Sequence, residues 1–380
     1  MQNPSKARQY NTKDWLKWLI PVILSILVTI ATYFHTWIED VYSIRIYPYI
    51  AQFLRLITGW LPFSIGDILY FLLGGWLLIK VIKTIIAAFR RKITKHKTLR
   101  RTFRLARLLM WIYIIFNLVW GFNYHRKGLD HQLQLQTGSY SSSEVEQVLN
   151  EVVMRLNENR LLISRDTVLP VQSFREMRSG AVESYHAAAQ KLSFLKYSIT
   201  SAKPSTYSSL AKYFGFTGYY NPFTGEAQLS TKIPEVMKPF ILCHEIGHQL
   251  GYAKENEASF AGYLAASGSD DPYFRYSVYL DLYSSLRSKL VYTKFSEKDT
   301  AVTEVLRAYN QKLDTLVRFD RRKIREYFQR NQTAVSEQTS SVVMGMYEQY
   351  LRANNQSAGL NSYDDVVSLL IAYRRKFGKV

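Results

Sequence analysis

The chain has 380 residues, enough for a sizeable hydrophobic core and for more than one structural unit. Its formal net charge of +19 is unevenly distributed, because residues 1–125 hold 17 of the 49 Lys and Arg residues but only 4 of the 30 Asp and Glu residues. This basic excess lies beside long apolar runs, as is typical of membrane flanks, and no nucleic-acid-reading motif accompanies it, so we expect no nucleic-acid binding. The single cysteine, Cys243, excludes an intrachain disulfide.

The first third of the chain predicts about three transmembrane helices, at about residues 18–36, 66–89 and 105–122. The first contains the uncharged run WLIPVILSILVTIATYF (Trp18–Phe34). As a helix this run would be about 26 Å long, which is close to the thickness of a bilayer's hydrocarbon core. We therefore expect the lipid bilayer to be a partner of this segment.

The charges around these runs predict an orientation. The densest basic block, RRKITKHKTLRR (Arg90–Arg101), lies between the second and third predicted spans. Basic loops remain on the cytoplasmic side, so we expect this loop and the N-terminus there. Residues 46–63 carry Arg55 within an apolar run, which favours an amphipathic helix at the opposite membrane surface. Three spans then predict a multi-pass protein of the bacterial cytoplasmic (inner) membrane with an extracytoplasmic, periplasmic C-terminal domain.

After Tyr124 the apolar runs give way to helical periodicity. Helices are predicted at Ser141–Leu162, Ala181–Ser193, Phe274–Val291, Thr300–Asp314, Ser340–Asn354 and Tyr363–Arg375. The serines that open the first of these, followed by Glu144 or Glu146, indicate an N-terminal cap. The stretch between Thr200 and Ile233 is instead rich in Gly, Asn and Pro, which indicates a turn or hairpin with a short strand at GEAQLST. The chain is therefore predicted to be mainly α, with a membrane domain at 1–123 and a mostly helical domain with a small β-hairpin or strand element at 124–380.

The segment PFILCHEIGHQLGY (Pro239–Tyr252) is predicted to be one helix that carries a metal-binding motif, with Gly251 ending it. His244 and His248 are four residues apart, so both imidazoles project from one face and can bind one Zn²⁺. Glu245 lies about 100° around the helix from His244, where its carboxylate can act as general base on a zinc-activated water without binding the metal. Two core histidines bonded to the backbone or to carboxylates are the alternative.

A second predicted helix, KENEASFAGYLAAS, offers two candidates for a third ligand, Glu255 and Glu257. They are about 200° apart around a helix, so only one can face the zinc. The segment Glu255-x-x-Ala258-Ser259 resembles the E-x-x-A-[D/N] signature of gluzincin metallopeptidases, in which the first acid binds zinc and the last residue supports a histidine. The resemblance implies Glu255 as ligand, although Ser259 departs from the signature. The pair Asn256-Glu257 resembles that of other gluzincins and makes Glu257 the alternative.

Over most of its length the chain also resembles the DUF3810 family of bacterial membrane proteins. The resemblance rests on the N-terminal spans followed by GYYNPFTGEAQLS, HEIGHQLGYAKENEASFAGYLA and YEQYLRANNQSAGLNSYDDVVSLLIAY. It implies a zinc metallopeptidase, so that the second domain would be zincin-like, and it implies no particular substrate.

The segment before the motif helix is a candidate for substrate contacts. In zincins an extended strand at the edge of the cleft pairs with the substrate backbone, and EAQLS is the candidate for that strand. Tyr219, Tyr220 and Asn221 could donate hydrogen bonds to the oxyanion. A structural hairpin with packed tyrosines is the alternative.

Two functions from different classes follow. The leading hypothesis is a membrane-anchored zinc-dependent metallopeptidase that hydrolyses peptides or envelope proteins with Glu245 as general base. The alternative is a non-catalytic zinc-binding receptor or scaffold of the cell envelope, which would have no need of Glu245. An intramembrane protease is disfavoured, because HEIGH lies outside the long apolar runs. The sequence leaves the oligomeric state open.

Overall fold

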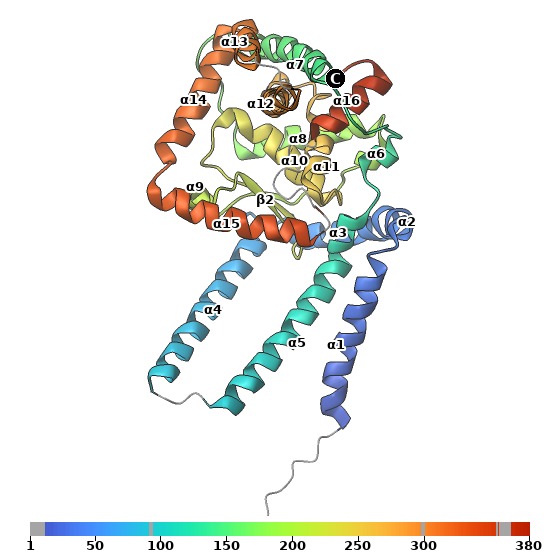
Figure 1. Ribbon diagram of the computed structural model, residues 1–380, viewed down its shortest axis with the longest axis vertical. Helices are drawn as coiled ribbons and strands as arrows, with labels where there is room; N and C mark the ends of the chain where they lie inside the picture. The colour runs from blue at the N-terminus through green and yellow to red at the C-terminus, as the bar shows by residue number, and fades with distance from the viewer. Residues whose placement is uncertain (1–11, 91–93, 298–300, 355, 357–365) are drawn as a thin grey trace, which may run out of the picture.

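The computed structural model describes residues 12–90, 94–297, 301–354, 356 and 366–380. Three long helices leave one side of a globular unit, as Figure 1 shows. The chain is mainly helical and contains a small three-stranded sheet, which confirms the predicted mainly α class.

The long helices correspond to the predicted spans and are α1 (Thr12–Ala31), α4 (Ile65–Phe89) and α5 (Lys95–Val119). Two stretches, Ile65–Ala87 and Thr98–Val119, are each long and apolar enough to cross a membrane. A third qualifies if Lys17–Ala31 and His35–Thr58, which meet at a bend of 89°, count as one span. Two or three of the described helices are therefore consistent with membrane association.

Two boundaries differ from the sequence prediction. Helix α1 ends at Ala31, before residue 36. The block at 90–101 was predicted to be a loop, but α5 begins inside it, at Lys95, and residues 91–93 lie outside the described part of the chain. A helix satisfies its own backbone hydrogen bonds, so it can extend past its apolar stretch to where basic side chains are hydrated.

Helix α4 has the surface expected of a lipid-facing helix. The side chains of residues 68–86 are all exposed, and most of them are apolar. A helix that is apolar on every side is suited to hydrocarbon rather than to water.

The chain turns from α1 into α4 through α2 (His35–Trp37), the π-helix η1 (Ile38–Ile46) and α3 (Tyr47–Thr58). Helix α3 confirms a helix within residues 46–63. Its Tyr47 and Arg55 are buried, whereas Tyr49 and Phe53 on the other side are exposed. The Arg55 Nη1 atom donates to the carbonyl oxygen of Gln249 at 3.0 Å. The arginine within this apolar run is therefore used to bond the end of another helix.

The globular unit is built around α7 (Ser142–Ile163) and α12 (Pro272–Ser296), which pack along each other. The predicted start of α7 is confirmed, because Ser141 and Glu144 form a reciprocal capping box. The other long helices are α8 (Phe174–Ala189), α10 (Lys238–Gln249), α11 (Glu255–Ala266), α13 (Val302–Lys312), α14 (Thr315–Asn331), α15 (Ala334–Ala353) and α16 (Val366–Phe377). Short helical turns complete the unit: η2 (Gly121–His125), α6 (Leu129–Gln132), η3 (Ser193–Leu195), η4 (Ser208–Leu210), α9 (Ala211–Phe214) and η5 (Glu235–Met237).

The sequence analysis missed α14, whose stretch RFDRRKIREYFQR is dominated by charge. Its Asp320 accepts a hydrogen bond from Arg160 of α7 at 2.6 Å, and both side chains are buried. Tyr276 of α12 donates to the same carboxylate at 2.8 Å. Long-range ion pairing of this kind leaves no periodic apolar signal in the sequence.

The sheet contains β1 (Ala202–Pro204), β2 (Gly218–Asn221) and β3 (Glu226–Leu229) in the order β1-β3-β2. β3 pairs parallel with β1 and antiparallel with β2. The predicted strand at GEAQLST is confirmed, but its predicted role at the edge is wrong, because β3 has a partner on both sides. The edge strand beside the site is β2.

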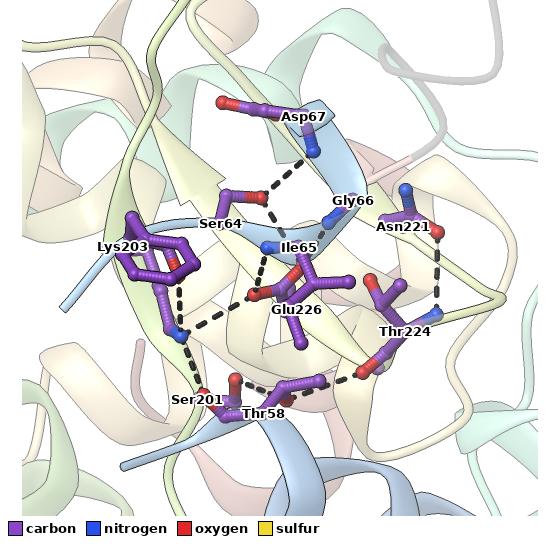
Figure 2. Close-up of polar contacts among 12 residues, drawn as sticks. Thr58, Ser64, Ile65, Gly66, Asp67, Ser201, Lys203, Asn221, Thr224 and Glu226 are labelled. Carbon is purple, nitrogen blue, oxygen red and sulfur yellow. Dashed lines mark hydrogen bonds and ion pairs between the residues drawn. The ribbon is translucent and has the colours of Figure 1, made fainter. Parts of the chain in front are cut away.

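A buried carboxylate on β3 holds the start of α4. Glu226 accepts hydrogen bonds from the backbone nitrogens of Ile65 at 3.0 Å and Gly66 at 2.6 Å, and from the Ser64 hydroxyl at 3.1 Å (Figure 2). A negative charge at a helix N-terminus satisfies free N–H groups and complements the helix dipole. Strand β3 is thus attached directly to α4, a candidate membrane span.

Lys203 of β1 completes this network. Its Nζ atom lies 3.3 Å from Oε1 of Glu226, and both side chains are buried. The same ammonium donates to the carbonyl oxygens of Thr58 and Phe63 (Figure 2). Burial lowers the pKa of Lys203, and Glu226 opposes that effect. Glu226 therefore helps to keep the buried Lys203 charged.

We predict that Glu226→Gln destabilises the protein strongly. The amide keeps the size of the side chain but leaves the Lys203 ammonium buried without its counter-charge, which typically costs about 3–5 kcal/mol. Glu348→Gln is the matched control, because the pair of Glu348 with Arg352 is exposed and such pairs contribute at most about 1 kcal/mol. Unfolding in mild detergent, followed by circular dichroism, measures both. A loss of stability no larger than that of the control would contradict this account.

Candidate metal centre

Helix α10 carries the HEIGH motif through the interior of the globular unit, and all its residues are buried. Pro239 occupies its first turn, where a missing N–H costs no helical hydrogen bond. After Leu250 the chain reverses at Gly251, whose φ of +87° favours glycine. The prediction of one helix ended by Gly251 is confirmed.

Helix α11 packs against α10 at unusually close range. A Cβ atom at Gly247 would lie 2.9 Å from the carbonyl oxygen of Ala258, and one at Gly262 would lie 3.1 Å from the nitrogen of His244. These contacts show that the two helices run antiparallel and that small residues fix their separation. The close approach brings the first residue of α11, Glu255, to the two histidines.

Three potential ligands converge at this point. Oε2 of Glu255 lies 3.2 Å from Nε2 of His244 and 3.6 Å from Nε2 of His248. The ligand atoms of the three residues all lie within 4.8 Å of one another, and all three side chains are buried. The other oxygen of Glu255, Oε1, accepts a hydrogen bond from the Tyr347 hydroxyl of α15.

The outward-facing nitrogen of each imidazole is engaged by the protein. Nδ1 of His244 lies 3.1 Å from the Ser259 hydroxyl, and Nδ1 of His248 lies 2.8 Å from the carbonyl oxygen of Tyr252. Hydrogen bonds of this kind orient metal-binding histidines and leave Nε2 for the ion. Ser259 thus stands beside His244, where the gluzincin signature would place Asp or Asn.

The donor set fits a divalent cation. Oε2 of Glu255 is buried and makes no well-aligned hydrogen bond within the described residues. A buried carboxylate oxygen without a donor is costly, and a cation between it and the two imidazoles would satisfy it. Two imidazole nitrogens and one carboxylate oxygen form a ligand set that Zn²⁺ favours.

The alternative ligand, Glu257, points elsewhere. Its Oε1 atom forms an ion pair with Lys254 at 3.1 Å, and it lies against the backbone at Gly128. Residues two apart lie about 200° apart around a helix, so the two acids point in different directions. Of the two, Glu255 alone lies next to the histidines.

Glu245 lies beside the cluster and under the edge strand. A Cβ atom at Gly218 of β2 would lie 2.6 Å from its Oε1 atom, so a larger residue there would displace the carboxylate. Its Oε2 atom is buried and has no hydrogen-bond partner in the described structure. Burial raises the pKa of Glu245 to about 8; His248 opposes this rise and Glu255 adds to it. The carboxylate is therefore desolvated and able to exchange a proton near neutral pH.

The cluster forms part of the wall of a cavity of about 380 Å³. The other walls are mainly aromatic and come from β2, α15 and the segment that follows α5. Lining residues include Trp120, Tyr124, Phe216, Tyr219, Tyr220, Asp281, Met344, Tyr347 and Tyr350. The site thus combines a buried ligand set with an open side large enough for part of a polypeptide.

Of the three predicted oxyanion donors, none has a free donor group aimed at the cluster. The Tyr219 hydroxyl donates to Asp67 at 2.6 Å, and the side chain of Asn221 accepts bonds within the turn after β2. The Tyr220 ring stacks on His248, with centroids 6.4 Å apart, and its hydroxyl pairs with that of Tyr47. The structure favours the alternative of a hairpin with packed tyrosines.

Sequence reasoning missed Tyr347, Asp281 and Trp120. Tyr347 is one of 28 tyrosines, and Asp281 lies alone in an otherwise apolar and aromatic stretch of α12. Trp120 follows α5 and donates from Nε1 to the carbonyl oxygen of His248 at 3.4 Å. No local pattern marks these residues, because the fold brings them to the cavity from distant parts of the chain.

A comparison with known protein families finds a match to the family described as a protein of unknown function (DUF3810), over residues 42–371. No curated protein and no solved structure matches the chain significantly. The matched segment includes α3, α4, α5 and all three residues of the candidate metal-binding cluster. Because the match covers most of the sequence, the chain belongs to the DUF3810 family.

Proposed function

We propose that the protein is a membrane-anchored zinc-dependent metallopeptidase. The observation that carries this proposal is the convergence of His244, His248 and Glu255 at the wall of a cavity, with the desolvated carboxylate of Glu245 next to them. A purely structural zinc site is normally closed by four protein ligands. Three ligands beside an open space are typical of a catalytic site.

The residues of the chain have distinct roles in this proposal. His244, His248 and Glu255 hold the ion, while Ser259 and Tyr347 orient two of these ligands. When bound there, zinc would supply Lewis-acid chemistry, lowering the pKa of a water molecule to about 7 and polarising a carbonyl group. Glu245 accepts a proton from the attacking water and returns it to the leaving amine. Its raised pKa suits both steps.

The surrounding fold supports a zincin-like arrangement. The motif helix α10 packs against β2 and β3, and residues 217–220 of the edge line the cavity. An unpaired strand edge next to the metal can bind an extended peptide through backbone hydrogen bonds. The proposed substrate is therefore a peptide or an unfolded segment of an envelope protein.

We further propose that the protein spans the bacterial cytoplasmic membrane with its N-terminus in the cytoplasm and the globular unit in the periplasm. The supporting observations are the long apolar helices and the basic residues of the sequence at 90–101, together with the end of α4 and the start of α5, which Figure 1 shows away from the globular unit. Basic residues are retained on the cytoplasmic side.

The first prediction of this proposal concerns the ligands. Purified protein should contain about one zinc per chain, and Glu255→Gln or His248→Ala should abolish stoichiometric binding because each removes one of three ligands. Glu257→Gln is the matched control and should retain zinc. Inductively coupled plasma mass spectrometry after dialysis measures all four proteins. Zinc lost from Glu257→Gln but kept by Glu255→Gln would assign the third ligand to Glu257 instead.

The second prediction concerns catalysis. Glu245→Gln should retain zinc but lose about 10²- to 10⁴-fold in peptide hydrolysis, since the amide cannot accept the proton. Labelled casein and a fluorogenic peptide library serve as substrates, with Glu257→Gln as control. If the Glu245→Gln protein kept both zinc and full activity, the mechanism would be wrong. Stoichiometric zinc without hydrolysis by the unmodified protein would favour the non-catalytic receptor or scaffold.

A further inference from the structure

An isolated carboxylate lies on the wall of the cavity. Asp281 of α12 is partly buried and lines the same cavity as His244 and Glu245. One turn earlier on α12, the Ser277 hydroxyl accepts a hydrogen bond at 3.0 Å from the backbone nitrogen of Phe240, at the start of α10. Asp281 therefore belongs to the end of the cavity formed by Phe240 and Ile241.

Asp281 has neither a hydrogen bond nor an ion pair among the described residues. The fully buried acids outside the candidate metal centre all have partners in the described part of the chain. Glu39 pairs with Arg126, Glu226 with Lys203, Glu257 with Lys254 and Asp320 with Arg160, while Asp67 accepts hydrogen bonds from Thr206 and Tyr219. Partial burial without a partner raises the pKa of Asp281 to about 7. Carboxylates in clefts with raised pKa values are concentrated at functional sites.

The rest of the cavity provides no cation for Asp281. No Lys or Arg is among the described residues that line it, and aromatic rings form a large part of its wall. Aromatic faces attract cations, and a cation that enters such a cavity restores the charge of a desolvated carboxylate. A neutral or anionic group at the same position would leave Asp281 unpaired or repel it.

We infer that Asp281 is a specificity residue that pairs with a cationic nitrogen group of the substrate, either an α-amino terminus or a lysine or arginine side chain. This inference rests on the proposed peptidase function and names a substrate class for the same site. The aromatic walls then contact the apolar part of that group, while the carboxylate neutralises its charge.

The test measures binding separately from cleavage. The Glu245→Gln protein, loaded with zinc, binds fluorescent peptides that differ in one group only: lysine against norleucine, arginine against citrulline, and a free against an acetylated N-terminus. We expect at least one cationic peptide to bind about 10- to 100-fold more tightly than its neutral partner, as is typical of a charge-assisted hydrogen bond. The pair that shows the difference identifies the source of the cation.

Adding Asp281→Asn should remove that preference and leave the affinity for neutral peptides unchanged. Glu183→Gln, an exposed acid on α8, is the matched control and should retain the preference. Asp281→Asn should also leave the unfolding midpoint unchanged or raised, because it removes a partly buried charge that has no partner among the described residues. When Asp281→Asn is the only substitution, kcat/KM for the cationic peptide should fall by the same factor relative to the unmodified protein.

The outcomes separate this inference from the proposed function. If peptides bind with a cation preference that depends on Asp281 but are not cleaved, the peptidase proposal fails and the inference stands as a binding site. The inference is overturned if no peptide pair shows a difference in affinity. It is also overturned if Asp281→Asn weakens the binding of cationic and neutral peptides equally. A lowered unfolding midpoint together with unchanged preference would make Asp281 structural.

Discussion

The arrangement of the site depends on how closely α10 and α11 approach each other. Gly247 and Gly262 leave no room for a side chain between the helices, so their backbones are in contact. The reversal at Gly251 is short enough that the next helix begins with Glu255 opposite both histidines. Helix α10 carries two of the potential ligands, His244 and His248, one turn apart. The third, Glu255, is positioned by the packing of α11 against α10 and not by a flexible loop. The ligand set is therefore rigid before any ion binds, which reduces the entropy cost of binding.

The acids in the interior and those at the cavity differ in their partners. Away from the cavity, buried acids are neutralised by arginine or lysine, as with Asp320 and Arg160 or Glu226 and Lys203. At the cavity, Glu245 and Asp281 lack a cationic partner within the described structure, and burial raises the pKa of each. The first group holds elements together, because removing either partner leaves a charge in the interior. The second group faces the cavity and pairs with no cation among the described residues.

Local patterns in the sequence predicted local features well. Histidines four residues apart, a glycine after a helix and a serine three residues before a glutamate each determine geometry over one or two turns, and α10, Gly251 and the α7 cap follow from them. The resemblance to gluzincins singled out Glu255, and the structure places it with the histidines.

Features that depend on tertiary contacts could not be predicted in this way. The edge position of β2 is determined by strand order, which short strand signals do not encode. Tyr347 and Asp281 reach the cavity from helices that lie far from the motif in sequence. Helix α14 was missed because charged residues dominate its stretch, and few apolar side chains, such as Val317, add to the buried ion pair that anchors it.

The predicted domain boundary between residues 123 and 124 marks a change in composition. The two sides of this boundary nevertheless pack against each other. The last carbonyl groups of α10, on His248 and Gln249, accept hydrogen bonds from Trp120, Arg55 and Tyr47, all of which precede that boundary. Trp120 and Tyr47 also share one buried apolar cluster with residues of α1 and α5. Because free helix ends are normally satisfied by local caps or water, this arrangement makes the segment before residue 124 the cap of α10. The helix that carries the two histidines is therefore completed by residues from the apolar first third of the chain, and separating the two parts would leave the carbonyl groups at its end without these donors.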